Sequence, residues 1–526
     1  MNQLLNQRIE KFRQNSQAAL LYGGLRGLEK ESLRVADTGG IAMTPHPVKI
    51  GAALTHPWIT TDYSEAMPEF ITPPLNNSQD VLCFLQDVQT FVYRQLENEK
   101  LWATSMPCIL NGEDNIPLAR YGKSNAGMMK TVYRRGLGFR YGRVMQVIAG
   151  VHFNYSVPEK FWPAYQAMEA QQEMSPVAFR NQNYMALVRN LQRFGWLIPY
   201  LMGASPAVCK SFFGDQPNEL DVFDSSTYYE PYATSLRMGD IGYQNSKEEG
   251  LGIKANYDSL EDYVDSLRCA ITTPASLWED IGIEVDGVWR QLNANILQIE
   301  NEYYSTVRPK AVLDGMEKPV DALSRKGIEY VELRSLDVNA YHPLGIDQVQ
   351  LDFLEIFMLF CLLHASPRVD AVERQEIDQN ILMVAHKGRT PLLKLRRHGD
   401  FVALEQWGME LFDQMLPLAQ LLDDVSGDCQ YVSALQYHLR MIHDANLTPS
   451  AMMLSEMRVN GEGFYAFANR MSQAHKKYFD ISPLATERLN NFNSLVEQSL
   501  RRQAEIEASD TMTFAAFLQA YEQGQL

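Results

Sequence analysis

The chain has 526 residues, 46% of them hydrophobic, and 47 lysines and arginines against 64 aspartates and glutamates, so its net charge is −17. An acidic chain without a basic cluster repels phosphate backbones, which excludes nucleic acid as the main partner. Its length predicts about three domains of roughly 150 residues, but no linker, repeat or low-complexity segment separates them.

The chain begins with MNQLLNQRIEKFRQ, which is typical of a polar amphipathic helix and not of a secretory signal. The most apolar stretches, residues 353–363 and 196–209, are too short or too interrupted to span a bilayer. The six cysteines are isolated and form no CxxC pair. Such cysteines are typical of reduced thiols, so we expect a cytoplasmic protein without a disulfide framework or a zinc site.

The segment GLRGLEKESLRV (residues 24–35) predicts a strand with carboxylates on its more apolar face. Alternation places Glu29 and Glu31 on the same side as Leu33 and Val35. Burying two carboxylates there is costly unless a cation holds them. The alternative is a solvated helix start, in which both acids are unremarkable.

The segment WITTDYSEAMPEFITPP (residues 58–74) carries Asp62, Glu65 and Glu69 among aromatic and aliphatic side chains, and prolines end it. The residues after Glu69 predict a strand on which this one acid points inward.

The segment QVIAGVHFNYSV (residues 146–157) has the clearest alternation in the chain. Every second residue from Val147 to Val157 is apolar, and His152 shares the other face with Gln146 and Asn154. A lone histidine is usually structural, but a histidine beside amides on one strand face also suits the wall of a binding site.

Two later segments, LNANILQIENEYY (residues 292–304) and GIEYVELRSLDV (residues 327–338), also place acids where strands favour apolar residues. The second puts Glu332 and Arg334 on one strand face, next to Tyr330. A salt-bridged pair on an edge strand is the alternative interpretation.

From about residue 345 onward, helical periodicity replaces alternation, as in VQLDFLEIFMLFCLLHA and LNNFNSLVEQSLRRQAEIEA. We therefore predict an α+β body over residues 1–344 and a mainly helical region over residues 345–526, packed together as one compact unit.

Together these segments predict a sheet face with many carboxylates, one histidine and several arginines. Oxygen ligands without cysteine favour a hard cation, Mg²⁺ or Mn²⁺, and magnesium commonly shares the phosphate oxygens of a nucleotide. Residues 121–124, YGKS, end like a P-loop, but Pro117 stands where its first glycine belongs. Metal ions and arginines are thus expected to hold the phosphates. The alternatives to a nucleotide-using enzyme are a metal-dependent hydrolase, which an acid-and-histidine cluster also suits, and a non-catalytic binding protein.

The same segments resemble, in order, motifs of the bacterial (proteobacterial-type) glutamate–cysteine ligases. These motifs include RGLEKESLRV, ALTHPWITTDYSEAMPEFITP, RYGRVMQVIAGVHFNYS and GIEYVELRSLD, and ASDTMTFAAFLQAY resembles the family's ending. The resemblance implies a glutamine-synthetase-like fold, in which a curved, mostly antiparallel sheet forms an active-site funnel. It also implies ATP-dependent ligation of the L-glutamate γ-carboxylate to the amine of L-cysteine through a γ-glutamyl phosphate, the first step of glutathione biosynthesis.

The resemblance further implies roles for single residues. Arg334 would approach the transferred phosphoryl group, with Arg134 as a second contact, and Arg237 would bind the α-carboxylate of glutamate. Several magnesium ions would be held by Glu29, Glu31, Asp62, Glu69, His152 and Glu332. The cysteine pocket would be lined by Tyr133, Gln146, Tyr243 and Tyr304.

One departure from the family is that Met67-Pro68 replaces the aliphatic residues that relatives carry before Glu69. Relatives are commonly inhibited by glutathione. The resemblance leaves open whether this chain is inhibited, whether it prefers Mn²⁺, and whether another amine replaces cysteine.

Overall fold

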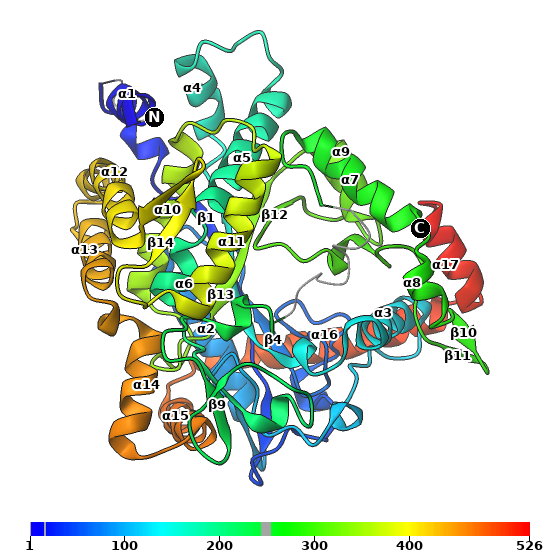
Figure 1. Ribbon diagram of the computed structural model, residues 1–526. Coiled ribbons are helices and arrows are strands. Elements are labelled where there is room, and N and C mark those ends of the chain that lie inside the picture. Colours follow the sequence, from blue (N-terminus) through cyan, green and yellow to red (C-terminus); the bar gives the residue numbers. More distant parts are fainter. Residues whose placement is uncertain (1, 15–16, 243–253) are drawn as a thin grey trace.

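The structure is a computed structural model that describes residues 2–14, 17–242 and 254–526. Its centre is a six-stranded sheet in the order β12-β13-β6-β1-β4-β3, and all neighbouring strands in it are antiparallel (Figure 1). The α+β class and the antiparallel sheet are therefore confirmed. The strands are β1 (Leu25–Glu31), β3 (Ile59–Thr61), β4 (Pro68–Ile71), β6 (Gly150–Ser156), β12 (Val307–Lys310) and β13 (Tyr330–Asp337).

Smaller sheets and helices surround this sheet. The small sheets pair β2 (Arg34–Ala36) with β5 (Glu99–Leu101), β7 (Ala207–Cys209) with β9 (Thr227–Tyr229) and β8 (Asp221–Val222), β10 (Glu284–Val285) with β11 (Val288–Trp289), and β14 (Lys394–Arg397) with β15 (Asp400–Ala403). The helices before residue 345 are α1 (Asn2–Gln14), α2 (Ser78–Tyr93), α3 (Asn125–Tyr141), α4 (Phe161–Met168), α5 (Pro176–Arg193), α6 (Leu197–Met202), α7 (Leu260–Thr272), α8 (Ser276–Glu279) and α9 (Pro319–Lys326).

One face of the central sheet is the core of the molecule. Its side chains, such as Leu28, Val151, Phe153 and Leu333, are at most 1% exposed. Helices α2, α5 and α6 contact this sheet, and α10 (Gln348–Leu363) lies behind them against α2 and α5. Helix α10 is buried on all sides, and a helix in such a position is expected to be apolar all round. This burial explains the apolar run at the end of its sequence. No described helix combines the length and the apolar composition needed to cross a membrane.

The segment after residue 345 is mainly helical. Its helices extend through α11 (Ala371–Lys387), α12 (Leu404–Ser426), α13 (Gln430–His443), α14 (Pro449–Asn460), α15 (Phe464–Ile481), α16 (Thr486–Ser509) and α17 (Phe514–Glu522). In Figure 1, α12 and α13 lie on one side of the sheet and α17 on the other. Helices α15 and α16 contact α2, and α17 contacts α3. The division at residue 344 and the packing of both parts as one compact unit stay predictions.

The strand predicted for residues 292–304 is wrong. Residues Glu300–Glu302 form a short 3₁₀ helix, η8, and no strand lies between residues 292 and 304 of the described chain. The amides compete with strand pairing because Asn293 donates to the carbonyl of Gln298 and accepts from the backbone N–H of Asn295. Residues 145–147 also form a 3₁₀ turn, η4 (Met145–Val147), so the strand β6 starts only at Gly150.

A buried ion pair links the first strand to α10. Arg26 Nη2 lies 2.7 Å from Glu355 Oε1, with the side chains 2% and 0% exposed. The hydroxyl of Tyr431 donates to Glu355 Oε2 at 2.6 Å. The pair therefore holds strand β1 against two helices of the C-terminal region.

We expect the substitution Arg26→Met to lower the free energy of unfolding by about 3–5 kcal/mol, because it leaves a buried carboxylate without its cation. Urea unfolding measures this loss. The double variant R26M/E355L should recover most of it, since an apolar pair has no charge to desolvate. A double variant no more stable than R26M would contradict the explanation.

Candidate active site

The register of the central strands brings the predicted acids to one face of the sheet. Glu29 lies opposite His152, and Glu31 lies opposite Glu69. On the other side of β6, Glu332 lies opposite Asn154. Cross-strand partners share a face, so one sheet surface carries these acids and the histidine. Pro68 is the first residue of β4, a position that tolerates proline.

These side chains line a cavity of about 640 Å³. Twelve of the residues singled out in the sequence contribute to its wall, from the sheet, from α3 and from the segments around η4, η6 (Leu236–Met238) and η8. They are Glu29, Glu31, Asp62, Glu69, Tyr133, Arg134, Gln146, His152, Arg237, Tyr304, Glu332 and Arg334. Tyr243 lies outside the described residues.

His152 is at the centre of the acidic cluster. Its Nδ1 lies 3.3 Å from Glu29 Oε2 and 3.5 Å from Glu332 Oε1, and its Nε2 lies 3.7 Å from Glu31 Oε1. Two groups of potential ligand atoms share this histidine: Glu29 with Glu332, and Glu31 with Glu69, each group within 4.8 Å. Asp62 lines the same cavity, but it belongs to neither group.

The carboxylates of the cluster differ in electrostatic environment. Burial acts to raise the pKa of Glu332, but Lys310, Arg334 and His152 outweigh it and hold that pKa well below its usual value. Burial and the neighbouring charges of Glu29, Asp62 and Glu31 instead raise the pKa of Glu69 well above its usual value. Glu332 is thus neutralised by protein cations, whereas Glu69 has an excess of negative charge around it.

The donor set fits a hard divalent cation. The carboxylate of Glu69 makes no hydrogen bond or ion pair with the described residues, and it faces Glu31 and His152 within ligand distance of one ion. A half-buried carboxylate without a partner is unfavourable unless a cation binds it. Oxygen ligands with one imidazole and no thiolate favour Mg²⁺ or Mn²⁺.

Two arginines approach the cluster from different elements. Arg334, on β13, lies 2.6 Å from Glu332 Oε1 and 3.4 Å from His152 Nδ1. Arg134, on α3, stacks over the ring of Tyr121 at 4.7 Å and donates through Nε to the carbonyl of Asp62. Both guanidinium groups are therefore fixed by the protein at the cavity wall.

A β-bulge in β13 decides which side chains after Arg334 lie on the acidic face of the sheet. Leu333 lies opposite Phe153 and Leu336 opposite Val151, so three steps along β13 match two along β6. Asp337 consequently lies opposite Gly150 and shares the face of His152. Strict alternation would have placed Leu336 there.

Asp337 helps to orient Arg237. Its carboxylate accepts hydrogen bonds from the hydroxyls of Ser205 and Ser235, and its Oδ1 lies 3.7 Å from Nη1 of Arg237. Arg237 Nη2 also donates to the carbonyl of Arg334 at 2.8 Å. A Cβ at Gly150 would lie 2.2 Å from the same nitrogen, so the close approach of Arg237 requires glycine there.

Three of the residues predicted for a second substrate, Tyr133, Gln146 and Tyr304, line the same cavity. Burial raises the pKa of Tyr133 and of Tyr304, so both hydroxyls stay protonated at neutral pH. Gln146 Nε2 is buried and has no hydrogen-bond partner among the described residues. These groups can donate hydrogen bonds to an anionic ligand.

The sequence interpretation missed two cations on β12. Arg308 and Lys310 line the cavity, and Lys310 Nζ lies 3.3 Å from Glu332 Oε2. Burial acts to lower the pKa of Lys310, but Glu332 outweighs it and raises that pKa. The alternation of basic residues in VRPK was the signal that could have identified them. Asp337 gave no such signal, because the bulge determines its face.

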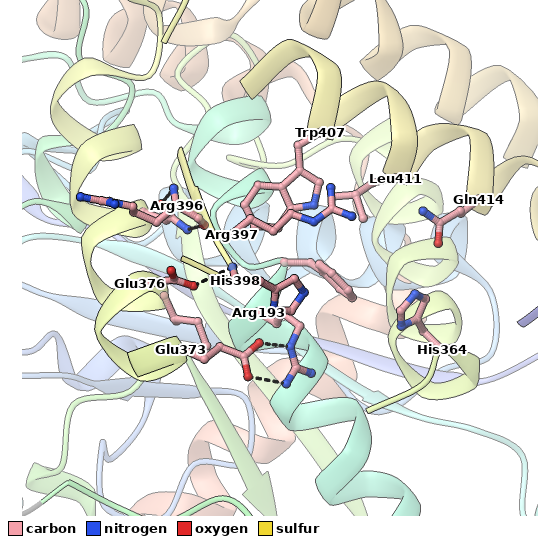
Figure 2. Close-up of a pocket in the computed structure, with 13 residues that line it drawn as sticks. Arg193, His364, Glu373, Glu376, Arg396, Arg397, His398, Trp407, Leu411 and Gln414 are labelled. Carbon is pink, nitrogen blue, oxygen red and sulfur yellow. Dashed lines mark hydrogen bonds and ion pairs between the residues drawn. The ribbon is translucent and has the colours of Figure 1, made fainter. Parts of the chain in front are cut away.

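A second, smaller hollow of about 50 Å³ lies between α5, α11, α12 and the hairpin β14–β15. Figure 2 shows that its charged side chains contact one another: Arg193 makes two contacts with Glu373, and Glu376 accepts the backbone N–H of His398. Arg193 and Glu373 pair with each other there, and none of the acids predicted for the site lines the hollow. The 640 Å³ cavity is therefore the candidate active site.

Comparisons with known proteins agree with this geometry. The sequence model of the glutamate–cysteine ligase family matches residues 9–384. The glutamate–cysteine ligases of Pseudomonas paraeruginosa and Azotobacter vinelandii are each 45% identical to the chain, covering 99% of it and 98% of the relative. The crystal structure of the Francisella tularensis glutamate–cysteine ligase in complex with AMP has a TM-score of 0.89 and 33% identity, covering 95% of this chain and 98% of that one.

A bifunctional glutathione synthetase from Pasteurella multocida, 24% identical with a TM-score of 0.73, shares the fold over 93% of this chain and 58% of its own. The family match includes the acidic sheet face and Arg134, Arg237 and Arg334. The full-length relatives extend the similarity over the helical region. The chain therefore belongs to the glutamate–cysteine ligase family.

Proposed function

We propose that the chain joins the γ-carboxylate of L-glutamate to the amine of L-cysteine, using ATP and releasing ADP and phosphate. The observation that carries this proposal is one cavity in which the acids around His152 face Arg134, Arg237 and Arg334, in a chain of this family. The complex of the Francisella tularensis relative with AMP supports an adenine nucleotide as the second substrate.

A carboxylate does not react with an amine at neutral pH because its oxygen is a poor leaving group. A γ-carboxylate oxygen of glutamate attacks the terminal phosphorus of ATP, and ADP leaves. The cysteine nitrogen then attacks the acyl carbon of the γ-glutamyl phosphate, inorganic phosphate leaves with that oxygen, and the nitrogen loses a proton. The protein aligns the reactants and neutralises charge.

Each residue has a proposed part in these steps. Magnesium held by Glu29, Glu31, Asp62, Glu69, His152 and Glu332 would neutralise the triphosphate and the attacking carboxylate. Arg334 and Arg134 contact the transferred phosphoryl group, and Arg237 binds the α-carboxylate of glutamate. The protonated hydroxyls of Tyr133 and Tyr304, with Gln146, bind the carboxylate of cysteine.

We propose that this reaction takes place in the cytoplasm. The six cysteines are all free thiols, as expected in a reducing compartment. Competition by glutathione, which contains the γ-glutamyl and cysteinyl groups of both substrates, stays a prediction.

A coupled ADP-release assay tests the function. We expect ADP to form only when glutamate, cysteine, ATP and Mg²⁺ are all present, and Mn²⁺ is tested in parallel. Faster turnover with another amine than with cysteine or 2-aminobutyrate would assign a different carboxylate–amine ligase. Product formation without ATP would indicate a hydrolase.

A further inference from the structure

The segment that carries Arg237 is docked on the C-terminal end of α11. The backbone N–H groups of Thr234 and Ser235 donate to the carbonyl of Ala385 at 2.9 and 3.1 Å. The hydroxyl of Thr234 donates to the carbonyl of Val384 at 2.9 Å. Carbonyls in the last turn of a helix need partners from outside it, and this segment supplies them.

His386, in the same turn, is held between two carboxylates. Its Nδ1 lies 2.8 Å from Glu230 Oε2, and its Nε2 lies 3.0 Å from Asp240 Oδ1. Ionised carboxylates only accept hydrogen bonds, so both contacts require an imidazolium with two N–H donors. The C-terminal end of a helix also favours a cation.

The two carboxylates lie on either side of Arg237 in the chain. Glu230 precedes it by seven residues and Asp240 follows it by three. One imidazolium on α11 thus closes a ring across residues 230–240 with Arg237 inside it. Neutral His386 has one N–H group and can donate to only one of the two carboxylates, so its Nε2 would instead accept the backbone N–H of Asp240, 3.3 Å away.

The surroundings of His386 favour its protonated form. Burial acts to lower its pKa, but the hydrogen bond and charge of Glu230, and then the charge of Asp240, raise that pKa above its ordinary value of 6.5. Other titratable groups on the elements that contact α11 have partners of their own: Arg389 donates to the carbonyls of Ala233 and Pro231, Tyr200 to that of Met441, and Arg397 lies against Glu410. Arg396 stacks over Phe401, Arg237 faces Asp337, and Lys394 is exposed.

We propose that His386 is a positioning residue for Arg237: the imidazolium joins Glu230 to Asp240 and thereby holds the intervening arginine in the orientation that binds glutamate. The proposal rests on the proposed role of Arg237. It gives the C-terminal helical region a part in substrate binding. Protonated His386 maintains the tighter glutamate site, and that site weakens as the pH rises through the pKa of His386.

The test compares H386Q with the wild type and with H443Q. His443 is a matched control because its Nδ1 lies 3.6 Å from Glu405, in a histidine–carboxylate pair that is 52% and 56% exposed and distant in sequence from Arg237. Initial rates are measured against glutamate concentration, at saturating ATP, cysteine and Mg²⁺, from about pH 6 to about pH 8.5.

We expect H386Q to raise the KM for glutamate about fivefold at the lower pH, with kcat within about twofold and the KM for ATP unchanged. The wild-type KM for glutamate should rise with pH, and that of H386Q should stay flat. H443Q should match the wild type. Because kcat and the KM for ATP stay constant, this pattern separates positioning of Arg237 from general damage.

A glutamate KM for H386Q equal to that of the wild type at every pH would overturn the proposal. A lower kcat together with a similar rise in the KM of every substrate would also overturn it, since that pattern indicates structural damage. If H386Q does not fold, the variant D240N tests the proposal instead. The Asp240 side chain is 64% exposed, so its substitution should not disturb folding, and the backbone N–H of residue 240 is kept. A raised glutamate KM in D240N supports the positioning role of His386, and an unchanged glutamate KM rejects it. A wild type that forms no ADP with glutamate and cysteine contradicts the proposed function itself.

Discussion

Glu69→Gln is expected to lower turnover on the order of 100-fold or more without lowering the melting temperature in EDTA. The amide cannot replace the anionic oxygen at the position shared with Glu31 and His152. Stability behaves differently because Glu29, Asp62 and Glu31 repel this carboxylate. The folded-state pKa of Glu69 lies above its unfolded value, so ionisation costs folding free energy at any pH above that unfolded value, and glutamine removes the cost.

The measurement pairs the ADP-release assay with thermal melts in EDTA and in Mg²⁺. Wild type should gain melting temperature on adding Mg²⁺ and Glu69→Gln should gain less, because a ligand that binds only the folded state stabilises it. Glu332→Gln provides the contrast. It should lose comparable activity but also lose stability in EDTA, since Arg334 and Lys310 would keep their charge and lose their anion.

Glu65→Gln is the matched control for these two variants. Glu65 is a buried acid in the same segment, but it accepts the backbone N–H groups of His46 and Arg120 and does not line the cavity. We expect this variant to keep its turnover and to lose stability. Full activity in Glu69→Gln and Glu332→Gln would contradict the metal assignment.

Arg334→Lys is expected to lower kcat on the order of 1,000-fold, the range found for arginines that stabilise a transferred phosphoryl group. Lysine keeps the positive charge beside Glu332, so folding should change little. The planar guanidinium of Arg334 contacts Glu332 and His152 and keeps further N–H groups for a phosphoryl oxygen. The single ammonium of lysine cannot make all of these contacts in the same geometry. The loss should therefore appear in kcat more than in the KM for glutamate.

Arg268→Lys is the matched control for this substitution. Arg268 pairs with Asp321 at 3.0 Å on the surface, with both side chains more than 40% exposed. Exposed ion pairs contribute little to stability, so kinetics and melting temperature should match the wild type. A kcat for Arg334→Lys near that of the wild type would remove Arg334 from phosphoryl transfer.

Alternation in the sequence was enough to predict the strands that carry the acids. In β1 and β6 each side chain alternates without interruption, so Glu29, Glu31 and His152 could be assigned to a face before their neighbours were known. The same reasoning failed for residues 292–304, where local amide hydrogen bonds replace strand pairing. It also missed Lys310, whose significance depends on Glu332 lying on the neighbouring strand.

The sequence by itself determined the fold class, the acidic strand face and, through its motifs, the family. These are properties of short segments, where periodicity and spacing are visible in the chain. Only the tertiary structure decided how distant segments meet: the bulge that turns Asp337 toward Arg237, and the placing of His386 between Glu230 and Asp240. Pairing between residues a hundred or more positions apart leaves no periodic trace in the sequence, because it depends on strand register and helix docking.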